Sequence, residues 1–328
     1  MELYPGADLI ECEIGGRPLY LPLLREGREA LLLDCGTRSH AQKDVPAYLD
    51  RVGFGNEDLS WLVVTHPDGD HCGGTAEIKR QHPQIRIACG EVDRALVESP
   101  DYMFEFRYDA YRQDHGIFFD ASTAQEIRDC SSAPQVVSFT FIGGEILRLG
   151  ENRILEVWHL PGHSHGHLGI YDKKHCTLYY GDAIQGAGYQ ALDGIRWTLC
   201  PTYLYVDSYL QTIQNIENSG VEMIVGCHWP VLRGTQAVKQ FCYESRNFVT
   251  LADRLITEYL REHTSGVSQR ELCEQLSPRL GTWPHDSHLE LSNAFSGHLD
   301  RGVKMRRFEV DRSRCPFLYR WCGGRAGE

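Results

Sequence analysis

Apolar and polar residues alternate along the first part of the chain, as they do in antiparallel strands. Gly15-Gly16 and Glu26-Gly27 separate the first of these stretches and indicate hairpin turns. Helices are predicted over 41–52 and 74–81. The predicted strands of this part are residues 9–14, 18–21, 30–34, 61–65 and 85–89.

The strand pattern returns in the second part of the chain. A helix over 206–217 precedes the last of these strands. The order of strands followed by helices occurs twice, which fits two sheets covered by helices better than one parallel βαβ sheet. We therefore expect a mixed α/β (α+β) protein with two sheets. The predicted strands here are residues 136–141, 153–159, 168–171, 177–180 and 221–225.

From about Thr235 the pattern becomes helical and continues through 247–263. Ser268 is a candidate N-cap, and a further helix is predicted over 289–300. Short extended pieces follow over 305–310 and 317–321. Three helices and a hairpin predict a small winged-helix-like domain over residues 241–328, after a first domain over 1–240.

Residues 101–119 are rich in aromatic side chains. One interpretation is a helix that packs these rings into the core. The other is a lid or wall over a binding pocket, because such pockets are often apolar and aromatic. The residues concerned are Tyr102, Met103, Phe104, Phe106, Tyr108, Tyr111, Phe118 and Phe119, together with Arg107, Arg112 and His115.

The composition is that of an ordinary folded protein: of 328 residues, 42% are hydrophobic and 24% are charged. The start of the chain lacks the basic and apolar regions of a signal peptide, and no run of about 18 apolar residues predicts a membrane span. The 12 cysteines have no paired spacing. We expect a cytoplasmic protein with reduced thiols and no membrane partner.

The formal charge of −12 is unevenly distributed. Residues 245–328 carry 13 Lys and Arg against 11 Asp and Glu, which leaves −14 for residues 1–244. The acidic first part argues against a general surface for polyanions. Near the C-terminal hairpin, a solvated surface is favoured over nucleic-acid contact for six basic residues: Arg301, Lys304, Arg306, Arg307, Arg312 and Arg314.

The strongest chemical signal is the loop His66-Pro67-Asp68-Gly69-Asp70-His71, which follows the predicted strand Trp61–Thr65. It places four potential metal ligands within six residues. Imidazole and carboxylate are ligands that zinc, iron or manganese use. Turn geometry explains Asp and Gly in such a loop but does not require two histidines. We therefore expect a metal site here.

Three further segments place a His or Asp just beyond a predicted strand. His163 lies in Leu160-Pro161-Gly162-His163-Ser164-His165-Gly166-His167, Asp182 follows Tyr179-Tyr180-Gly181, and His228 follows Val225-Gly226-Cys227. A rigid sheet can position such residues closely. Cys72 and Cys227 flank these residues, and buried packing is the favoured role for both.

With these motifs the chain resembles the metallo-β-lactamase-fold hydrolase superfamily, in particular its glyoxalase II-like and lactonase-like branch. The resemblance covers roughly residues 8–232. It implies an αββα sandwich of two mixed sheets flanked by helices, with the metal site at one edge between the sheets. The motifs that carry it are Leu33-Asp34-Cys35-Gly36, the loop 66–71, Pro161-Gly162-His163-Ser164-His165-Gly166-His167, Gly181-Asp182 and His228.

The resemblance also implies a set of ligands. Asp34 would orient ligands without binding metal, and His167 would be a structural hydrogen-bonding residue. Two divalent ions, Zn²⁺ first, are the implied cofactors. The ligands would be His66, Asp68 and His163 at a first metal, Asp70, His71 and His228 at a second, and Asp182 as a bridge between them.

The mechanism implied by the resemblance is hydrolysis by a hydroxide that two metal ions about 3.5–4 Å apart share. The hydroxide would attack the carbonyl carbon of a small ester, thioester, lactone or related substrate. Asp70 would act as the catalytic residue that accepts a hydrogen bond from this hydroxide and orients it.

Position 68 departs from the family, most of which has His where this chain has Asp68. A carboxylate shifts the preference of the site toward harder ions such as Fe or Mn. The diiron oxygen-reducing members of the family also have a carboxylate at this position, so a diiron redox protein is one alternative. The His-Pro-Asp-x-Asp-His sequence resembles the metallo-β-lactamase-like domains of DNA-uptake channel proteins, so a phosphodiesterase or nucleic-acid-acting protein is another.

Substrate contacts are expected from Tyr108 in the aromatic segment and from Tyr189, Arg196 and Trp197 after the bridging aspartate. Arg196 could bind a carboxylate or phosphate, or equally form an exposed salt bridge. The expected partner is a small-molecule substrate. The C-terminal domain is expected to form a homodimer or to close one side of the pocket.

Overall fold

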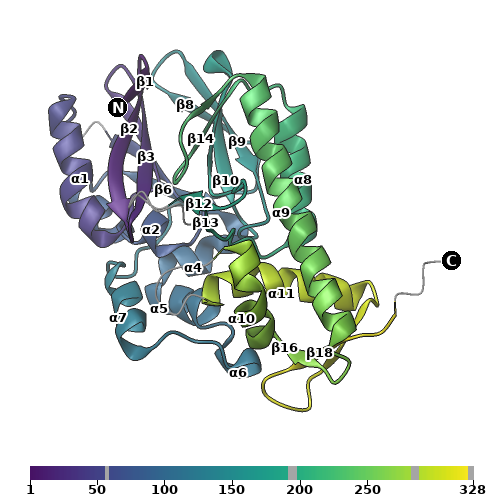
Figure 1. Ribbon diagram of the computed structural model, residues 1–328. Helices are drawn as coiled ribbons and strands as arrows, with labels where there is room; N and C mark the ends of the chain where they lie inside the picture. The colour runs from purple at the N-terminus through teal and green to yellow at the C-terminus, as the bar shows by residue number, and fades with distance from the viewer. Residues whose placement is uncertain (56–58, 191–197, 282–287, 324–328) are drawn as a thin grey trace.

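Two mixed β-sheets pack face to face in the computed structural model, and helices cover their outer faces (Figure 1). The structure describes residues 1–55, 59–190, 198–281 and 288–323. Buried apolar side chains of both sheets fill the space between them, for example Leu9 and Leu31 from one sheet and Val157 and Ile170 from the other. The predicted αββα sandwich is therefore confirmed.

The first sheet has seven strands in sequence order. Its first four strands are joined by antiparallel pairing, and the pairing from β4 to β7 is parallel. The strands are β1 (Glu2–Tyr4), β2 (Ala7–Ile14), β3 (Arg17–Glu26), β4 (Glu29–Leu33), β5 (Leu59–Val63), β6 (Arg86–Gly90) and β7 (Phe139–Phe141).

The second sheet has six strands in the order β15-β14-β11-β10-β9-β8. Its pairs are antiparallel except for β11 and β14, which run parallel. The strands are β8 (Ile146–Leu149), β9 (Arg153–His159), β10 (Leu168–Asp172), β11 (Thr177–Gly181), β14 (Met223–Gly226) and β15 (Leu232–Arg233). A separate two-stranded sheet joins β12 (Tyr189–Gln190) and β13 (Thr198–Leu199).

Helices α1 (Arg38–Arg51) and α3 (Thr75–Gln81) pack on the outer face of the first sheet. Helices α8 (Val206–Asn218) and α9 (Thr235–Glu262) cover the second sheet (Figure 1). The Thr37 hydroxyl caps α1 by accepting a hydrogen bond from the His40 N–H. The shorter helices are α2 (Gly69–Cys72), η1 (Glu91–Asp93), α4 (Arg94–Glu98), α7 (Ala121–Asp129) and η3 (Lys173–His175).

The aromatic segment is broken into short pieces rather than one core helix. They are α5 (Pro100–Met103), the π-helical η2 (Phe104–Tyr108) and α6 (Arg112–His115). Phe104 is buried, whereas 53% of the surface of Phe106 is exposed. The segment therefore packs some of its rings inward and leaves others at the surface, a division that its composition does not predict.

The C-terminal part consists of the far end of α9, α10 (Gln269–Leu280), α11 (His288–Lys304) and a three-stranded sheet. This sheet has the order β16 (Val267–Ser268), β18 (Leu318–Trp321), β17 (Phe308–Asp311). Ser268 caps α10 as predicted, since its hydroxyl accepts a hydrogen bond from the Glu271 N–H at 3.1 Å. The division at 240/241 falls inside the continuous helix α9, and the two-domain division and its winged-helix character stay predictions.

A chain of polar contacts joins the C-terminal helices to the sandwich. Both terminal nitrogens of Arg307 bind the Asp253 carboxylate, at 2.9 and 2.7 Å. His298 lies between Asp253, at 3.4 Å from its Nδ1, and the buried Tyr203 hydroxyl, at 2.8 Å from its Nε2. These contacts therefore connect α9, α11 and the residues after α11 to Tyr203, which lies in the segment before α8.

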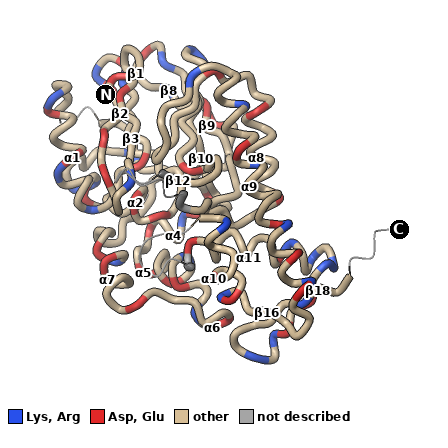
Figure 2. Tube along the Cα trace, in the orientation of Figure 1, with Lys and Arg blue, Asp and Glu red and all other residues tan. Residues whose placement is uncertain are grey.

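Basic and acidic residues are interspersed along the outer helices (Figure 2). Among the basic residues near β18, Arg301 pairs with Asp207 and Arg314 with Asp311. Among the described residues, no helix combines the length and the apolar character needed to cross a bilayer.

We predict that Asp253→Asn lowers the free energy of unfolding at pH 7 by about 1–3 kcal/mol, because hydrogen bonds to a charged partner are lost. Burial raises the pKa of Asp253, but its bonds to His298 and Arg307 outweigh burial and hold it below the ordinary value. The contribution is therefore full above about pH 4, the unfolded value, and is lost as pH falls toward the folded pKa. Denaturant titrations from pH 7 to pH 2 measure it. Asp207→Asn, in an exposed pair, is the control, and an equal loss there would contradict the prediction.

Candidate metal centre

Four strands end at the same edge of the sandwich, and a polar residue of the predicted site follows each of them. Asp34 follows β4, His66 lies beyond β5, Asp182 follows β11 and His228 lies beyond β14. The pairs β4/β5 and β11/β14 are parallel, so their carboxyl ends coincide. His163, in the loop between β9 and β10, completes the group.

The buried carboxylate of Asp34 organises this edge. It accepts hydrogen bonds from the Thr65 N–H at 2.7 Å, the Thr65 hydroxyl at 2.8 Å and His71 Nδ1 at 2.9 Å. Because the Thr65 hydroxyl donates its proton to Asp34, it accepts one from His66 Nδ1, 2.9 Å away. Asp34 thereby fixes the proton of two imidazoles on Nδ1 and turns their Nε2 atoms toward the centre.

His71 and His228 face each other with their Nε2 atoms 3.3 Å apart. The Nδ1–H of His228 donates to the Pro18 carbonyl at 2.7 Å. Carboxylates lie close to this pair: Asp70 Oδ2 is 3.4 Å from His228 Nε2, and Asp182 Oδ1 is 3.9 Å from His71 Nε2. Two imidazole lone pairs and two carboxylates therefore converge on one point.

The second group contains His66, Asp68 and His163. His163 Nε2 and His66 Nε2 lie 2.9 and 3.3 Å from Asp68 Oδ2. His163 Nδ1 faces the Thr202 carbonyl at 3.2 Å. Asp68 occupies the N-cap of α2 without making a side-chain cap bond, so its carboxylate serves the site rather than the helix.

Asp182 lies beside the His71/His228 pair, with its Oδ1 3.9 Å from His71 Nε2 and its Oδ2 3.7 Å from His228 Nε2. Tyr189 donates a hydrogen bond to Asp182 Oδ2 at 3.0 Å, and the backbone N–H of Asp182 donates to His167 Nε2 at 3.2 Å. The preceding Gly181 has a φ of +54°, and a Cβ there would lie 2.7 Å from the Thr65 hydroxyl oxygen. Glycine at this position therefore lets β11 approach β5 and brings Asp182 to the centre.

The electrostatics of the site favour a cation. Burial lowers the pKa of His71, but the carboxylates of Asp70, Asp34 and Asp182 outweigh burial and raise it well above its ordinary value. Burial and the nearby His71 hold the pKa of His66 well below its ordinary value, so His66 is a neutral ligand. Burial raises the pKa of Asp70, but His71, His228 and Arg17 outweigh burial and hold it well below its ordinary value, so Asp70 stays ionised.

Two buried atoms support the fit to a metal ion. His66 Nε2 and Asp182 Oδ1 have no hydrogen-bond partner among the described residues. Donor atoms of His66, Asp68 and His163 lie within 4.8 Å of one another, as do those of Asp70, His71 and His228. Neutral imidazole nitrogens and carboxylate oxygens are a suitable donor set for a divalent ion. All seven predicted ligands are thus brought together at one edge.

Two arginines make contacts at the site that were not predicted from the sequence, although Arg107 lies in the aromatic segment for which a pocket wall was one interpretation. Arg17 in β3 donates from Nη2 to Asp70 Oδ2 at 2.9 Å. Arg107 in η2 binds both carboxylate oxygens of Asp68. No local motif marks either residue, because each pairs with an acid that is distant in sequence.

A cavity of about 90 Å³ opens over the two groups. Tyr108 and Tyr189, for which substrate contact is predicted, line this cavity, and the Tyr108 hydroxyl also accepts a hydrogen bond from the Gly69 N–H at 3.0 Å. Arg196 and Trp197 lie outside the described residues. Glu290 and Asn293 of α11 form part of the wall, so the C-terminal part contributes to the cavity.

Comparisons with known proteins agree with this architecture. The sequence model described as "Metallo-beta-lactamase superfamily" matches residues 23–228. A metallo-beta-lactamase family protein from Thermus thermophilus has the same fold, with a TM-score of 0.75 and 20% identity over 97% of this chain and 99% of that one. A beta-lactamase domain protein from Burkholderia ambifaria gives a TM-score of 0.73 and 15% identity over 98% and 93% of the two chains.

Similar sequences include three enzymes. An atrochrysone carboxyl ACP thioesterase from Aspergillus novofumigatus is 21% identical over 64% of this chain and 49% of its own length. A hydroxyacylglutathione hydrolase from Synechococcus sp. is 24% identical over 52% and 54%. An acyl-coenzyme A thioesterase from Gallus gallus is 25% identical over 49% and 56%. The chain thus spans about half the length of these relatives.

We predict that Asp34→Asn lowers the affinity of the site for Zn²⁺ about 10- to 100-fold, the usual effect of removing a group that orients ligands. Asparagine tolerates the left-handed backbone at this position, where φ is +58°, so the fold should persist. Isothermal titration of the metal-free chain measures the affinity. The exposed Asp50→Asn serves as the control, and unchanged affinity in Asp34→Asn would refute the orienting role.

Proposed function

The chain belongs to the metallo-beta-lactamase superfamily, and from this premise we propose that it is a metal-dependent hydrolase of acyl thioesters or esters. The observation that carries the proposal is the convergence of the His71 and His228 Nε2 atoms with Asp70 and Asp182. Two of the similar proteins are named thioesterases, which favours a thioester over a lactone.

Zn²⁺ is the proposed ion, with Fe or Mn as the choice that the carboxylate of Asp68 would favour. Bound divalent ions polarise a carbonyl and lower the pKa of water toward 7. His71, His228, Asp70 and Asp182 would hold one ion. His66, His163 and Asp68 would hold a second, with Asp182 between the two.

The protein residues position the reactants. Asp70, fixed by Arg17, accepts a hydrogen bond from the attacking water and orients it. Tyr189 holds Asp182 through its hydroxyl and is itself held by Gln185 Nε2 at 2.7 Å. The tautomers that Asp34 sets in His66 and His71 keep their Nε2 atoms ready to bind a metal ion, so little reorganisation is needed.

The cavity of about 90 Å³ is smaller than the roughly 300–1,000 Å³ of sites that enclose a whole ligand. We therefore expect the reacting acyl end to enter and the remainder of the substrate to lie outside the described wall.

We predict that Asp70→Asn lowers kcat/KM for acyl thioesters about 100- to 10,000-fold, as expected when a residue that orients or accepts a proton is lost. Hydrolysis of acyl-coenzyme A and p-nitrophenyl esters, followed by absorbance, measures it. Chelation should abolish the activity and Zn²⁺ should restore it.

The exposed Asp50→Asn is the matched control for Asp70→Asn. Full activity in chelated protein, or in Asp70→Asn that keeps the wild-type circular dichroism, would contradict the proposed function. Absence of turnover on a panel of thioesters, esters and lactones by the Zn²⁺-loaded chain would do so as well.

We predict that Asn293→Ala raises KM about two- to tenfold with little change in kcat, because one cavity-lining hydrogen-bonding group is removed far from the reacting bond. Tyr111 donates to Asn293 Oδ1 at 3.0 Å and positions it. Steady-state kinetics on the best thioester measure the split. Asn215→Ala, on the exposed face of α8, should change neither constant, and a fall in kcat alone for Asn293→Ala would argue against a binding role.

A further inference from the structure

Arg107 occupies the position from which an ion would contact Asp68 and His163. Its Nε and Nη2 bind the two carboxylate oxygens of Asp68, and Nη2 lies 2.9 Å from Asp68 Oδ2. The same Nη2 donates to His163 Nε2 at 2.9 Å, and Nη1 donates to the His163 carbonyl at 3.3 Å. Guanidinium only donates hydrogen bonds, so it uses the lone pair with which His163 would bind metal.

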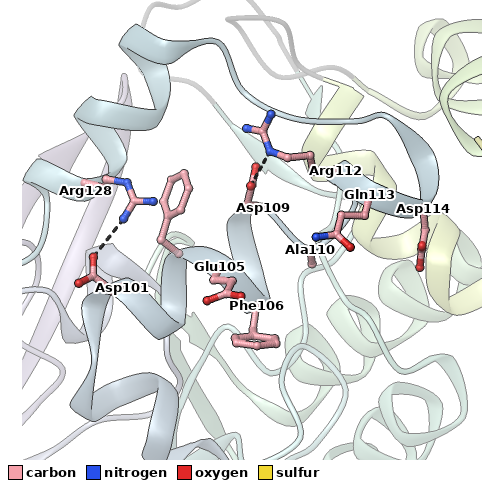
Figure 3. Close-up of a pocket in the computed structure, with 10 residues that line it drawn as sticks. Asp101, Glu105, Phe106, Asp109, Ala110, Arg112, Gln113, Asp114 and Arg128 are labelled. Atoms are coloured by element: carbon pink, nitrogen blue, oxygen red, sulfur yellow. Dashed lines mark hydrogen bonds and ion pairs between the residues drawn. The ribbon is translucent and has the colours of Figure 1, made fainter. Parts of the chain in front are cut away.

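The segment that carries Arg107 holds it firmly. The side chain of Arg107 is only 8% exposed. The hydroxyl of the neighbouring Tyr108 accepts a hydrogen bond from the Gly69 N–H, which anchors the segment to the loop 66–71. On the outer face, Glu105, Phe106 and Asp109 line an open groove (Figure 3). The π-helical turn of η2 therefore points Arg107 and Tyr108 inward, whereas Glu105 and Phe106 face solvent.

Among the described residues, no guanidinium donates to the Nε2 atoms of His71 or His228 as Arg107 does to that of His163. Arg17 contacts Asp70 there through one nitrogen, Nη2. The facing Nε2 atoms of His71 and His228 are 3.3 Å apart and their Nδ1 atoms are engaged elsewhere. The imidazole lone pairs of His71 and His228 are thus free to bind a metal ion, whereas the lone pair of His163 is already used by Arg107.

The charges of the ligand cluster agree with this asymmetry. Four carboxylates, those of Asp34, Asp68, Asp70 and Asp182, face two guanidiniums, those of Arg17 and Arg107. When the imidazoles bind a metal ion, they do so as neutral ligands, and the six charged groups then leave two negative charges, which one divalent ion balances. Glu290 lines the same cavity but belongs to none of the groups that could hold an ion among the described residues.

We infer that Arg107 is a built-in counterion of the His66/Asp68/His163 group and makes the two metal sites unequal. The chain binds one divalent ion tightly at Asp70, His71, His228 and Asp182. A second ion binds weakly, because it must first displace Arg107 from Asp68 and His163. This inference rests on the proposed function for the existence of the metal sites, and it assigns Arg107 a positioning role in them.

The test is the stoichiometry and affinity of Zn²⁺ binding to the metal-free full chain, measured by titration calorimetry and by equilibrium dialysis with elemental analysis. Wild-type protein should bind one ion tightly and a second at least about tenfold more weakly, since a buried ion pair must be broken. Arg107→Gln should tighten the second ion about tenfold or more and leave the first unchanged. Arg107→Lys keeps the charge and should keep the second ion weaker than in Arg107→Gln.

Arg112→Gln is the matched control, because Arg112 pairs with Asp109 on the exposed side of the same segment (Figure 3). It should bind like wild type. Should Arg107→Gln fail to fold, Co²⁺ titration of wild-type protein still decides: its visible spectrum should develop in two separate phases. Two equally tight ions in wild type, a single Co²⁺ phase at two equivalents, or no change in folded Arg107→Gln would each overturn the inference. A wild-type chain that binds no metal would overturn the proposed function with it.

Discussion

The site depends on one buried carboxylate. Asp34 has an exposed fraction of 0% and a left-handed backbone, a combination that is unfavourable unless its oxygens are fully hydrogen-bonded. The donors that satisfy it are the N–H and hydroxyl of Thr65, the Nδ1 of His71 and, at 3.5 Å, the Sγ of Cys227. Asp34 follows β4, whereas Thr65 and His71 follow β5. The requirement to satisfy Asp34 therefore also fixes how the ends of these two strands approach and which nitrogen of His71 faces the centre.

Concentrating acids at a strand edge creates a second constraint, since like charges repel in a region from which water is largely excluded. The chain meets it with cations from different elements, Arg17 from β3 and Arg107 from η2. The two arginines act differently. Arg17 touches one ligand by one nitrogen, whereas Arg107 engages Asp68 with its planar fork and also takes the lone pair of His163. The two groups therefore differ in how far their donor atoms are already engaged by a guanidinium.

Much of this could be predicted from sequence, because the ligands are encoded locally. His66 to His71 lie in one loop, and Asp182 and His228 each follow a strand whose apolar run is plain. Arg107 could not be predicted: it lies in an aromatic stretch with no clear period, and its inward direction depends on a π-helical turn. Asn293 was missed because contact between α11 and the cavity depends on how the C-terminal helices dock, which no local pattern describes.

The docking of these helices also has a consequence for the ligands. Thr202, whose carbonyl faces His163 Nδ1, is followed directly by Tyr203, whose hydroxyl meets His298 of α11. His298 is held in turn by Asp253 of α9. A displacement of the C-terminal helices would therefore move the peptide that orients His163 as well as the wall that Asn293 forms. The C-terminal part is thus a mechanical component of the metal centre, and its packing and the geometry of the His66/Asp68/His163 group should be regarded as one coupled structure.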